Sequence, residues 1–171
     1  TVPGTVDGWF ELHNRYGKLA MSQVLAPAIR YAREGFPISP VIGFYFERAR
    51  SSFESRVDQI NEFENARATY FSPEAPKVGD IFKNDDLGKT LAILAKGGQD
   101  AFYKGKIAKT IDRYMRRIGG DLSYSDLATH TSEWVDPVCV DYREVQLCEL
   151  PPNGQGFAAL QMVSILKNAN L

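Results

Sequence analysis

A glycine-containing stretch late in the chain has the spacing of a nucleotide-binding motif. Residues 150 to 160 read LPPNGQGFAAL, in which Gly154, Gly156 and Ala159 match the pattern G-x-G-x-x-A. In dinucleotide-binding folds this pattern follows the first strand of a parallel β-α-β unit and seats a pyrophosphate on a helix N-terminus. Here the preceding segment is expected to be the second arm of a hairpin. We therefore interpret the glycines as a sharp, closely packed turn from a strand into a helix, and predict no cofactor.

A second stretch, LGKT at 87–90, resembles the end of a phosphate-binding loop. The first glycine of G-x-x-x-x-G-K-[ST] would have to stand at position 83, which is Lys83. Asp85 and Asp86 would lie inside that loop and repel a phosphate. We do not interpret this stretch as a nucleotide site.

Basic residues line one side of a helix that we expect over residues 106–118. A solvated helix face often has this composition. An anion-binding stripe stays open as the alternative, in which a non-catalytic helical module would bind an anionic partner. The residues of this basic stripe are Lys106, Lys109, Arg113, Arg116 and Arg117.

Two hydroxyl-containing features suggest nucleophilic catalysis. An N-terminal threonine such as Thr1 can be a nucleophile whose own amine is the base, but no His, Lys or Arg stands near it in the sequence to tune that amine. The stretch ATHTS at 128–132 puts hydroxyls beside His130. Working dyads need side chains that converge from separate elements, so we expect a turn at a helix end instead.

The cysteines and histidines are too few and too far apart for a zinc centre. Cys139 and Cys148 are the only cysteines, and His13 and His130 are the only histidines. We expect the cysteines to be small, half-buried residues in neighbouring strands. No metal site is predicted.

Composition is that of an ordinary globular chain. Of 171 residues, 44% are hydrophobic and 24% charged, and 20 Lys plus Arg against 21 Asp plus Glu give a net charge of -1. Without a global positive field we expect no nucleic-acid partner and no attraction to anionic membranes. No apolar run reaches the ~18 residues of a membrane span, and one domain is the default expectation.

The hydrophobic periodicity predicts a mainly helical region over residues 1–130. Asp7 is expected to cap a first helix that ends at Gly17. Met21 to Ala32 form an apolar stripe on a second helix, which Pro27 should kink or restart and which Gly35 with Pro37 should close. Ser39-Pro40 should open a further helix whose aromatic residues suggest wide burial. Residues 64–83 contain Pro73, Pro76 and Gly79 and no sustained hydrophobic period, so a long irregular connection is expected there. Helices are expected over 84–96, ending at Gly97-Gly98, and over 106–118, ending at Gly119-Gly120, and Ser123 with Asp126 should give a capping-box start to a short helix.

The last forty residues have a different pattern. The segments 134–140 and 144–150 alternate in polarity and predict a β-hairpin within 133–150, with its turn around 141–144. A helix over 155–168 follows. The expected fold class is therefore α+β, predominantly helical with a late β-hairpin.

Several blocks resemble, in order, those of the gamma-glutamyltranspeptidase family. They are VPGTVDGW, LAPAIRYAREGFPIS, GGQDAFYKGKIAKTI and GGDLSYSDLATHTSEWVDPVCVDYREVQLCELPPNGQG. Together they cover nearly the whole chain, and their joint occurrence is more specific than any one of them. The chain departs from the family at His130 and Cys148, where an aromatic residue is usual or frequent, and at Glu144, where glycine is usual.

The resemblance implies a segment of an N-terminal-nucleophile hydrolase with an αββα sandwich. Such a proenzyme cleaves itself before a threonine and moves the gamma-glutamyl group of glutathione or related amides to water or an amine. The resemblance places residues 1–171 as a single segment within the large subunit, between the substrate-binding arginine and the nucleophilic threonine. By this mapping neither Thr1 nor His130 is catalytic, and we carry over no catalytic residue.

Two classes of function follow from the sequence. In the first, the chain is a large-subunit segment, inactive alone, whose partners are the remainder of the parent polypeptide, including the small subunit, and a glutathione-like substrate. In the second, it is the self-contained module with the basic stripe. A detached segment should leave the aromatic face of residues 41–53 uncovered, or buried in a dimer, whereas a self-contained domain should not. The resemblance alone suggests a periplasmic or extracellular location.

Overall fold

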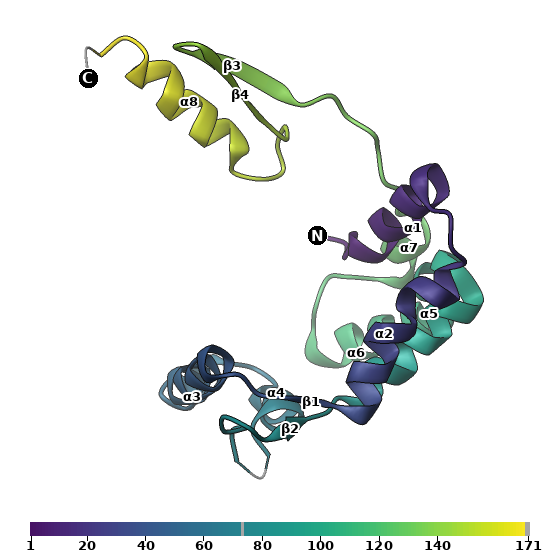
Figure 1. Cartoon of the computed structure of the whole chain (residues 1–171). Coiled ribbons are helices and arrows are strands. Elements are labelled where there is room, and N and C mark those ends of the chain that lie inside the picture. The colour runs from purple at the N-terminus through teal and green to yellow at the C-terminus, as the bar shows by residue number, and fades with distance from the viewer. Residues whose placement is uncertain (73, 170–171) are drawn as a thin grey trace. The chain divides into compact units, whose positions relative to one another are not determined.

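The computed structural model describes residues 1–72 and 74–169, which form two compact units, Thr1–His130 and Thr131–Leu171. The first is helical, and the second contains a hairpin and one helix (Figure 1). That the whole chain is a single segment of one larger domain stays a prediction. Across the described residues, none of the helices combines the length and apolar character that crossing a bilayer requires.

The first helix, α1 (Thr5–Tyr16), begins earlier than the sequence suggested. Its N-cap is Gly4, which has no side chain to cap with, and Asp7 lies inside the first turn and is buried. The prediction that Asp7 caps this helix was therefore wrong. An acidic residue in the first turn still interacts favourably with the helix dipole. The predicted end is confirmed, since the Gly17 N–H donates to the His13 carbonyl at 2.7 Å.

The second helix, α2 (Met21–Glu34), runs through Pro27 as a single helix rather than restarting there. Its buried stripe is narrower than predicted, because Leu25 and Ala32 are buried whereas Val24 and Ala28 are exposed. The helix ends at Gly35, which has φ 89° and whose added Cβ would lie 2.5 Å from an Ile81 methyl group. Glycine is thus favoured at position 35 by both its backbone conformation and the lack of space.

Helix α5 (Asp85–Tyr103) is the central helix of the first unit. The Asn84 side chain caps it by accepting from the Leu87 N–H at 2.9 Å. The helix was predicted to end at Gly97-Gly98. Instead, Gly98 interrupts it with φ 67° and ψ -167°, and helical structure resumes up to Tyr103.

Two helices follow as predicted. Helix α6 (Lys106–Ile118) ends at Gly119 with φ 73°. Helix α7 (Tyr124–Ala128) has the predicted capping box, in which Ser123 Oγ accepts from the Asp126 N–H and Asp126 Oδ2 accepts from the Ser123 N–H.

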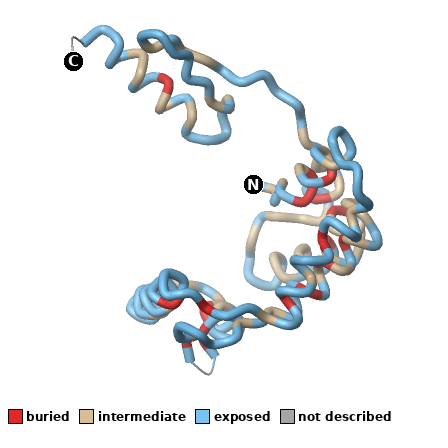
Figure 2. The backbone as a smooth tube through the Cα atoms, viewed as in Figure 1, coloured by how far each residue is buried: buried red, intermediate tan, exposed pale blue. Residues whose placement is uncertain are grey.

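The main core of the first unit lies where α1, α2, α5, α6 and α7 meet (Figure 2). Each helix contributes an apolar face, and these faces pack directly against one another as a helix-on-helix core. Leu94, at 1% exposure, and Leu127 are among its fully buried side chains. The buried members are Val6, Phe10, Leu25, Leu91, Leu94, Tyr103, Ala108 and Leu127.

Helix α3 (Pro40–Glu54) begins as predicted, with Ser39 Oγ accepting from the Ile42 N–H at 3.3 Å and Pro40 in the first turn. The wide burial predicted for its aromatic residues is wrong: Phe44 is 61% and Tyr45 55% exposed. The reason is that in this chain α3 is covered on one side only, where Gly43 packs closely against Val78 and Ile38.

The region predicted as an irregular connection over 64–83 contains regular structure. After the short 3-10 helix η1 (Val57–Gln59), helix α4 (Phe63–Tyr70) places Phe63 in a small core with Phe71 and Ala75. Strand β1 (Phe36–Pro37) then pairs antiparallel with β2 (Ile81–Phe82). Pro73, which contributed to that prediction, lies outside the described residues.

The second unit is a hairpin with a helix against both its strands. Strands β3 (Val138–Tyr142) and β4 (Val145–Glu149) form the predicted antiparallel hairpin, in a register that sets Tyr142 opposite Val145. The two-residue turn forms with Arg143 at φ 54° in place of a glycine. Residues 134–137 were predicted as strand but precede it, and α8 (Gly156–Leu166) ends before the predicted residue 168. The predicted fold class, mainly helical with a late hairpin, is confirmed at this level.

Candidate functional site

A buried polar cluster joins the start of the chain to α5. Asp7 is 3% exposed, and its backbone N–H donates to the Tyr103 hydroxyl at 3.1 Å. The same hydroxyl donates to the Pro3 carbonyl at 2.7 Å. Burial raises the pKa of Tyr103 above its ordinary value, so the hydroxyl keeps its proton for this bond at neutral pH. The cluster fixes the turn that precedes α1.

His130 completes this cluster from the end of α7. Its ring stacks on Tyr103 with centroids 5.1 Å apart, and its Nε2 lies 3.8 Å from Asp7 Oδ2. The buried Nε2 has no hydrogen-bond partner. Thr129 Oγ1 donates to the Ser125 carbonyl at 2.8 Å, which confirms the predicted turn at a helix end. His130 is thus held as a packing residue.

An aromatic groove lies beside α3 and α4, with a volume of about 350 Å³. Several of its aromatic rings lie against one another: the ring centroids of Phe53 and Phe71 are 6.1 Å apart, and those of Tyr70 and Phe71 are 6.3 Å apart. Its lining is almost wholly apolar, and Figure 2 shows that most of α3 is exposed. The lining residues are Ile42, Tyr45, Phe46, Ala49, Phe53, Tyr70 and Phe71. This is the uncovered face that the sequence predicted for a detached segment.

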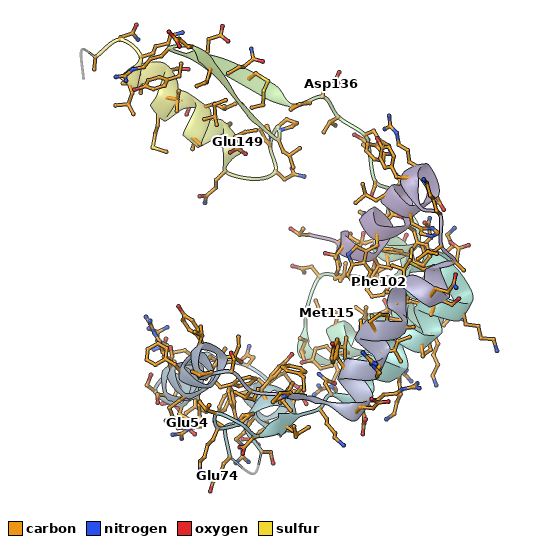
Figure 3. All side chains as sticks on the ribbon, in the orientation of Figure 1. Glu54, Glu74, Phe102, Met115, Asp136 and Glu149 are labelled. Atoms are coloured by element: carbon orange, nitrogen blue, oxygen red, sulfur yellow. A yellow bond between two sulfur atoms is a disulfide. The ribbon has the colours of Figure 1, made fainter. Side chains whose placement is uncertain are left out.

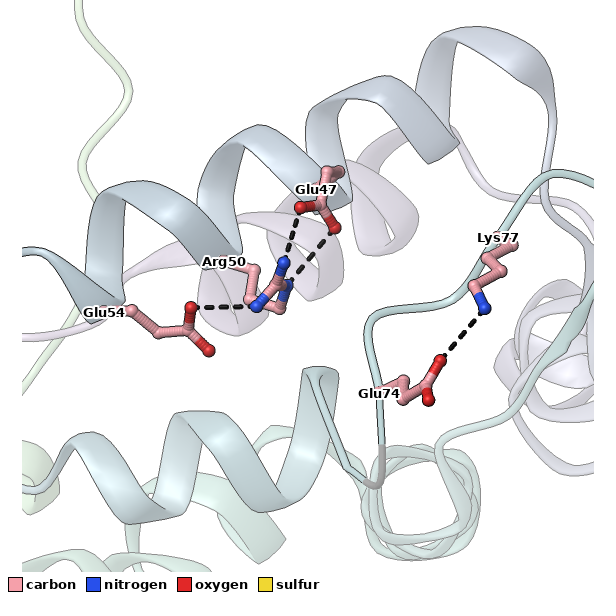
Figure 4. Close-up of polar contacts among 5 residues, drawn as sticks. All are labelled: Glu47, Arg50, Glu54, Glu74 and Lys77. Carbon is pink, nitrogen blue, oxygen red and sulfur yellow. Dashed lines mark hydrogen bonds and ion pairs between the residues drawn. The ribbon is translucent and has the colours of Figure 1, made fainter.

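A charged hollow of about 370 Å³ lies on α3, close to the aromatic groove. Arg50 contacts Glu47 at 2.6 Å and Glu54 at 2.8 Å, and Lys77 contacts Glu74 at 3.0 Å (Figure 4). The hydrogen bond from Arg50 lowers the pKa of Glu47, and the one to Glu74 raises the pKa of Lys77. Arg50 is shared by two carboxylates, and Arg67 also lines the hollow, so three positive and three negative side chains surround it.

Two arginines of the basic stripe form ion pairs. Arg117 binds Glu62 through both guanidinium nitrogens, at 2.7 and 3.1 Å, and holds this residue before α4 although its φ is 64°. Arg116 pairs with Asp112 at 2.9 Å. The Arg117 pair joins α6 to the start of α4, whereas the Arg116 pair lies within α6, and both are ordinary structural roles for such a face.

The glycine-containing and lysine-containing motifs do not form nucleotide sites. Strand β4 runs antiparallel to β3, so the β-α-β unit that a dinucleotide fold requires is not formed at this point. Gly156 is the first residue of α8, and an added Cβ would lie 2.8 Å from Glu149 Cβ. Figure 3 labels Glu149 at this junction. Close packing is thus confirmed at Gly156, whereas Gly154 has open space around it.

The LGKT stretch lies within α5, where Gly88 is buried against Arg33 and Ala32 instead of facing a loop. Within the described parts of the chain, His, Cys, Asp and Glu side chains do not gather in threes as a bound metal ion would require.

The cysteines form a disulfide, which the sequence analysis missed. Cys139 and Cys148 are directly opposite in the hairpin, with Cα atoms 4.1 Å apart. The expected placement in neighbouring strands is confirmed and Cys139 is half-buried, but Cys148 is exposed and the two sulfurs are bonded. A signal was present: each cysteine stands four positions from the turn residue nearest to it, Arg143 or Glu144. A two-residue hairpin turn then sets them face to face.

The comparison with known proteins decides the family. Residues 1–171 match the family model described as Gamma-glutamyltranspeptidase. The chain belongs to the gamma-glutamyltranspeptidase family. Curated relatives include the glutathione hydrolase-like YwrD proenzyme of Bacillus subtilis, 34% identical over 98% of this chain, and the glutathione hydrolase proenzyme of Pseudomonas aeruginosa, 36% identical over 98%. The chain spans 31% and 28% of the lengths of these two proteins.

Solved structures of this family share the fold of the chain. A cephalosporin acylase from Bacillus halodurans superposes with a TM-score of 0.89 at 36% identity, covering 100% of this chain and 32% of its own. The gamma-glutamyltranspeptidase of Helicobacter pylori gives 0.83 at 30% identity, covering 99% and 48%. The gamma-glutamyltranspeptidase blocks recognised in the sequence therefore correspond to one continuous portion of longer proteins.

Within this gamma-glutamyltranspeptidase portion the sequence analysis nominated no catalytic, cofactor-binding or metal-binding residue, and this stays a prediction. It missed the polar cluster because Asp7 looked like an ordinary helix cap, and nothing local ties Tyr103 to a residue about a hundred positions earlier. The gamma-glutamyltranspeptidase match gives no support to the alternative of an anion-binding module.

Proposed function

We propose that this chain is an internal segment of the large subunit of a gamma-glutamyltransferase or glutathione hydrolase. Such an enzyme hydrolyses or transfers the gamma-glutamyl group of glutathione and related amides. The observation that carries the proposal is the family match over residues 1–171, combined with TM-scores of 0.89 and 0.83 to a cephalosporin acylase and a gamma-glutamyltranspeptidase.

In this proposal the hairpin and α8 belong to the αββα sandwich of an N-terminal-nucleophile hydrolase. A two-stranded hairpin is marginal by itself and leaves backbone donors and acceptors unpaired along both outer edges. Further strands would pair with those edges, and α8 would be part of one helical layer. The exposure of Val138, Val145 and Leu147 supports such additional cover.

The reacting groups would come from flanking polypeptide. A threonine released by self-cleavage would attack the gamma-amide carbonyl with its own amine as general base, and an oxyanion hole would stabilise the tetrahedral intermediate. Residues 1–130 would act as a scaffold, in which the Asp7–Tyr103–His130 cluster fixes the beginning of the VPGT block.

The aromatic groove would be covered by the remainder of the parent polypeptide, including the small subunit. The observation that supports this cover is the set of exposed large apolar residues on α3, because exposed apolar surfaces of this kind mark contacts with other polypeptide. A second copy of the chain is the competing occupant, and the mass of the isolated chain in solution distinguishes the two.

The test compares the isolated chain with a longer protein made from the flanking coding sequence. We expect the longer protein to cut itself into two subunits and to hydrolyse a chromogenic gamma-glutamyl anilide, and the isolated chain to show no turnover. Replacing the threonine at the cleavage site should abolish activity, whereas Thr1→Ala in the longer protein should leave it unchanged. Turnover by the pure isolated chain that disappears on Thr1→Ala would overturn the proposal.

A further inference from the structure

The Cys139–Cys148 disulfide occupies an unusual place for a structural bond. Cys148 is exposed and Cys139 is half-buried, so Cys148 is the more accessible of the two residues. Side chains on one face of a strand recur every second residue, and the cysteines therefore share their face with Asp141 and Gln146. These two polar residues hydrogen-bond across the strands at 3.0 Å. The disulfide thus lies on the polar face of the hairpin.

Apart from the disulfide, the hairpin is held in its unit by α8, which contacts both strands but buries little. Among the described residues of the second unit, Leu160 of α8 is the single buried side chain. Strand β4 leads directly into the bend at 150–155, and Gly156 at its far end packs against Glu149. Loosening of β4 would therefore also loosen the first turn of α8.

We propose that this disulfide is a thiol-exchange site for a thiol of the glutathione class, and that its opening releases the hairpin and the bend that follows it. The inference rests on the proposed function, under which glutathione is a thiol that this protein meets as a substrate. Here glutathione would react through its sulfur, whereas the proposed enzymatic reaction uses its gamma-amide. The thiol of the substrate would thereby control how well ordered the hairpin and the following bend of the enzyme are.

The chemistry balances in two steps. A glutathione thiolate attacks Cys148 Sγ, the bond between Cys148 and Cys139 breaks, and Cys139 leaves as a thiolate that takes up a proton. A second glutathione thiolate then attacks the glutathione sulfur of the mixed disulfide and releases Cys148. The protein disulfide gains two electrons, and two glutathione thiols become one glutathione disulfide.

The first measurement is the rate of opening in the full 171-residue chain, followed by alkylation and mass spectrometry. In glutathione the folded chain should open within about tenfold of the rate of the chain unfolded in guanidinium, because the attacked sulfur is exposed. The trapped intermediate should have glutathione on Cys148 and an alkylated Cys139. A folded chain that resists glutathione, or a mixed disulfide formed mainly at Cys139, would overturn the proposal.

The second measurement asks whether opening releases the hairpin. Amide hydrogen exchange over residues 138–149 should accelerate by at least about tenfold after reduction, while α5 is unchanged. A matched variant, C139T/C148Y, replaces the disulfide by a cross-strand pair of a β-branched and an aromatic residue and should be insensitive to glutathione. Equal exchange before and after reduction would contradict the release.

This test is separate from that of the proposed function. The two experiments measure the redox state of the disulfide and amide hydrogen exchange in the isolated chain, for which no turnover is expected. 2-Mercaptoethanol, which has no gamma-glutamyl group, should give the same opening and release, since only the thiol takes part. If the longer protein failed to hydrolyse the anilide while the disulfide still opened, the proposed function would fail alone. An active longer protein with a disulfide inert to thiols would refute only this inference.

Discussion

The two units of this chain are held together by different means. In residues 1–130, five helices enclose a continuous apolar core with Leu94 and Leu127 at its centre. In residues 131–169, a hairpin and α8 bury one described side chain, and a covalent bond joins the strands. Hydrophobic burial is the dominant favourable term in folding, so the first unit contains the means of its own stability. The second relies on a cross-link and on contacts with further polypeptide.

The two units also expose apolar surface for different reasons. The apolar face of α3 belongs to the unit with a core, yet it is left out of that core. The apolar residues of the hairpin are exposed because their unit is too small to cover them. Both surfaces are expected to be buried in the longer protein, and in the isolated chain the cross-linked hairpin should be folded but less protected than the helical core.

The largest effect should come from breaking the core of the first unit. Leu94→Ala removes a fully buried side chain from the centre of α5 and should lower the free energy of unfolding by ~3–4 kcal/mol. Urea denaturation in a Trp134→Phe background would monitor this unit through Trp9. Leu12→Ala, at a 55% exposed position, is the control and should cost less than ~0.5 kcal/mol. Equal losses from the two changes would refute the assigned core.

A smaller effect, confined to the second unit, is expected from removing the disulfide. The Cys139→Ser and Cys148→Ser double variant should destabilise the hairpin by ~2–3 kcal/mol, the loss expected for a short closed loop. Trp134 fluorescence in a Trp9→Phe background would measure it. Unfolding of residues 1–130 should be unaffected, and a shift in that transition would show that the units do not behave as described.

The polar cluster of the first unit should contribute less than its apolar core. Tyr103→Phe removes a hydroxyl bonded to both the Asp7 N–H and the Pro3 carbonyl, and should cost ~1–2 kcal/mol by leaving these buried groups unsatisfied. Tyr31→Phe, at an exposed position, is the matched control with little expected change. If the two substitutions had equal effects on the urea midpoint, the cluster would not anchor the N-terminal turn.

The smallest effect concerns pH. Hydrogen bonds from Arg117 and Arg116 lower the pKa of Glu62 and of Asp112, respectively. Groups whose pKa is lower in the folded state stabilise it fully above the ordinary carboxyl value of about 4, and this contribution disappears as pH falls through the lowered values. The urea midpoint of the first unit should therefore fall between pH 5 and pH 2, by less in Glu62→Gln. An identical decline in that variant would exclude a contribution from Glu62.

Much of the fold could be predicted from local pattern. Helix ends set by glycine, proline or serine, such as Gly35, Ser39-Pro40 and Gly119, depend on nearby backbone geometry, which the sequence encodes directly. The hairpin also followed from alternation and turn position. The family was recognisable because its blocks occur in order along the whole chain.

The features that escaped prediction depend on distant partners. The burial of Asp7 requires Tyr103, and the exposure of Phe44 depends on what covers α3 rather than on the composition of the helix. Helix α4 was missed because Pro73, Pro76, Gly79 and the lack of a sustained hydrophobic period suggested an irregular segment, whereas the packing of Phe63 and Phe71 stabilises a helix. Reactive groups that other polypeptide would contribute likewise cannot be predicted from the local pattern of these residues.

Hydrogen exchange in the isolated chain and in the longer protein tests most directly whether this chain is the scaffold of a larger enzyme. We predict that amides of α5 near Leu94 are protected in both, and that α3 and the β3–β4 hairpin gain strong protection only in the longer protein. Full protection of α3 and of the hairpin in a monomeric isolated chain would contradict the account.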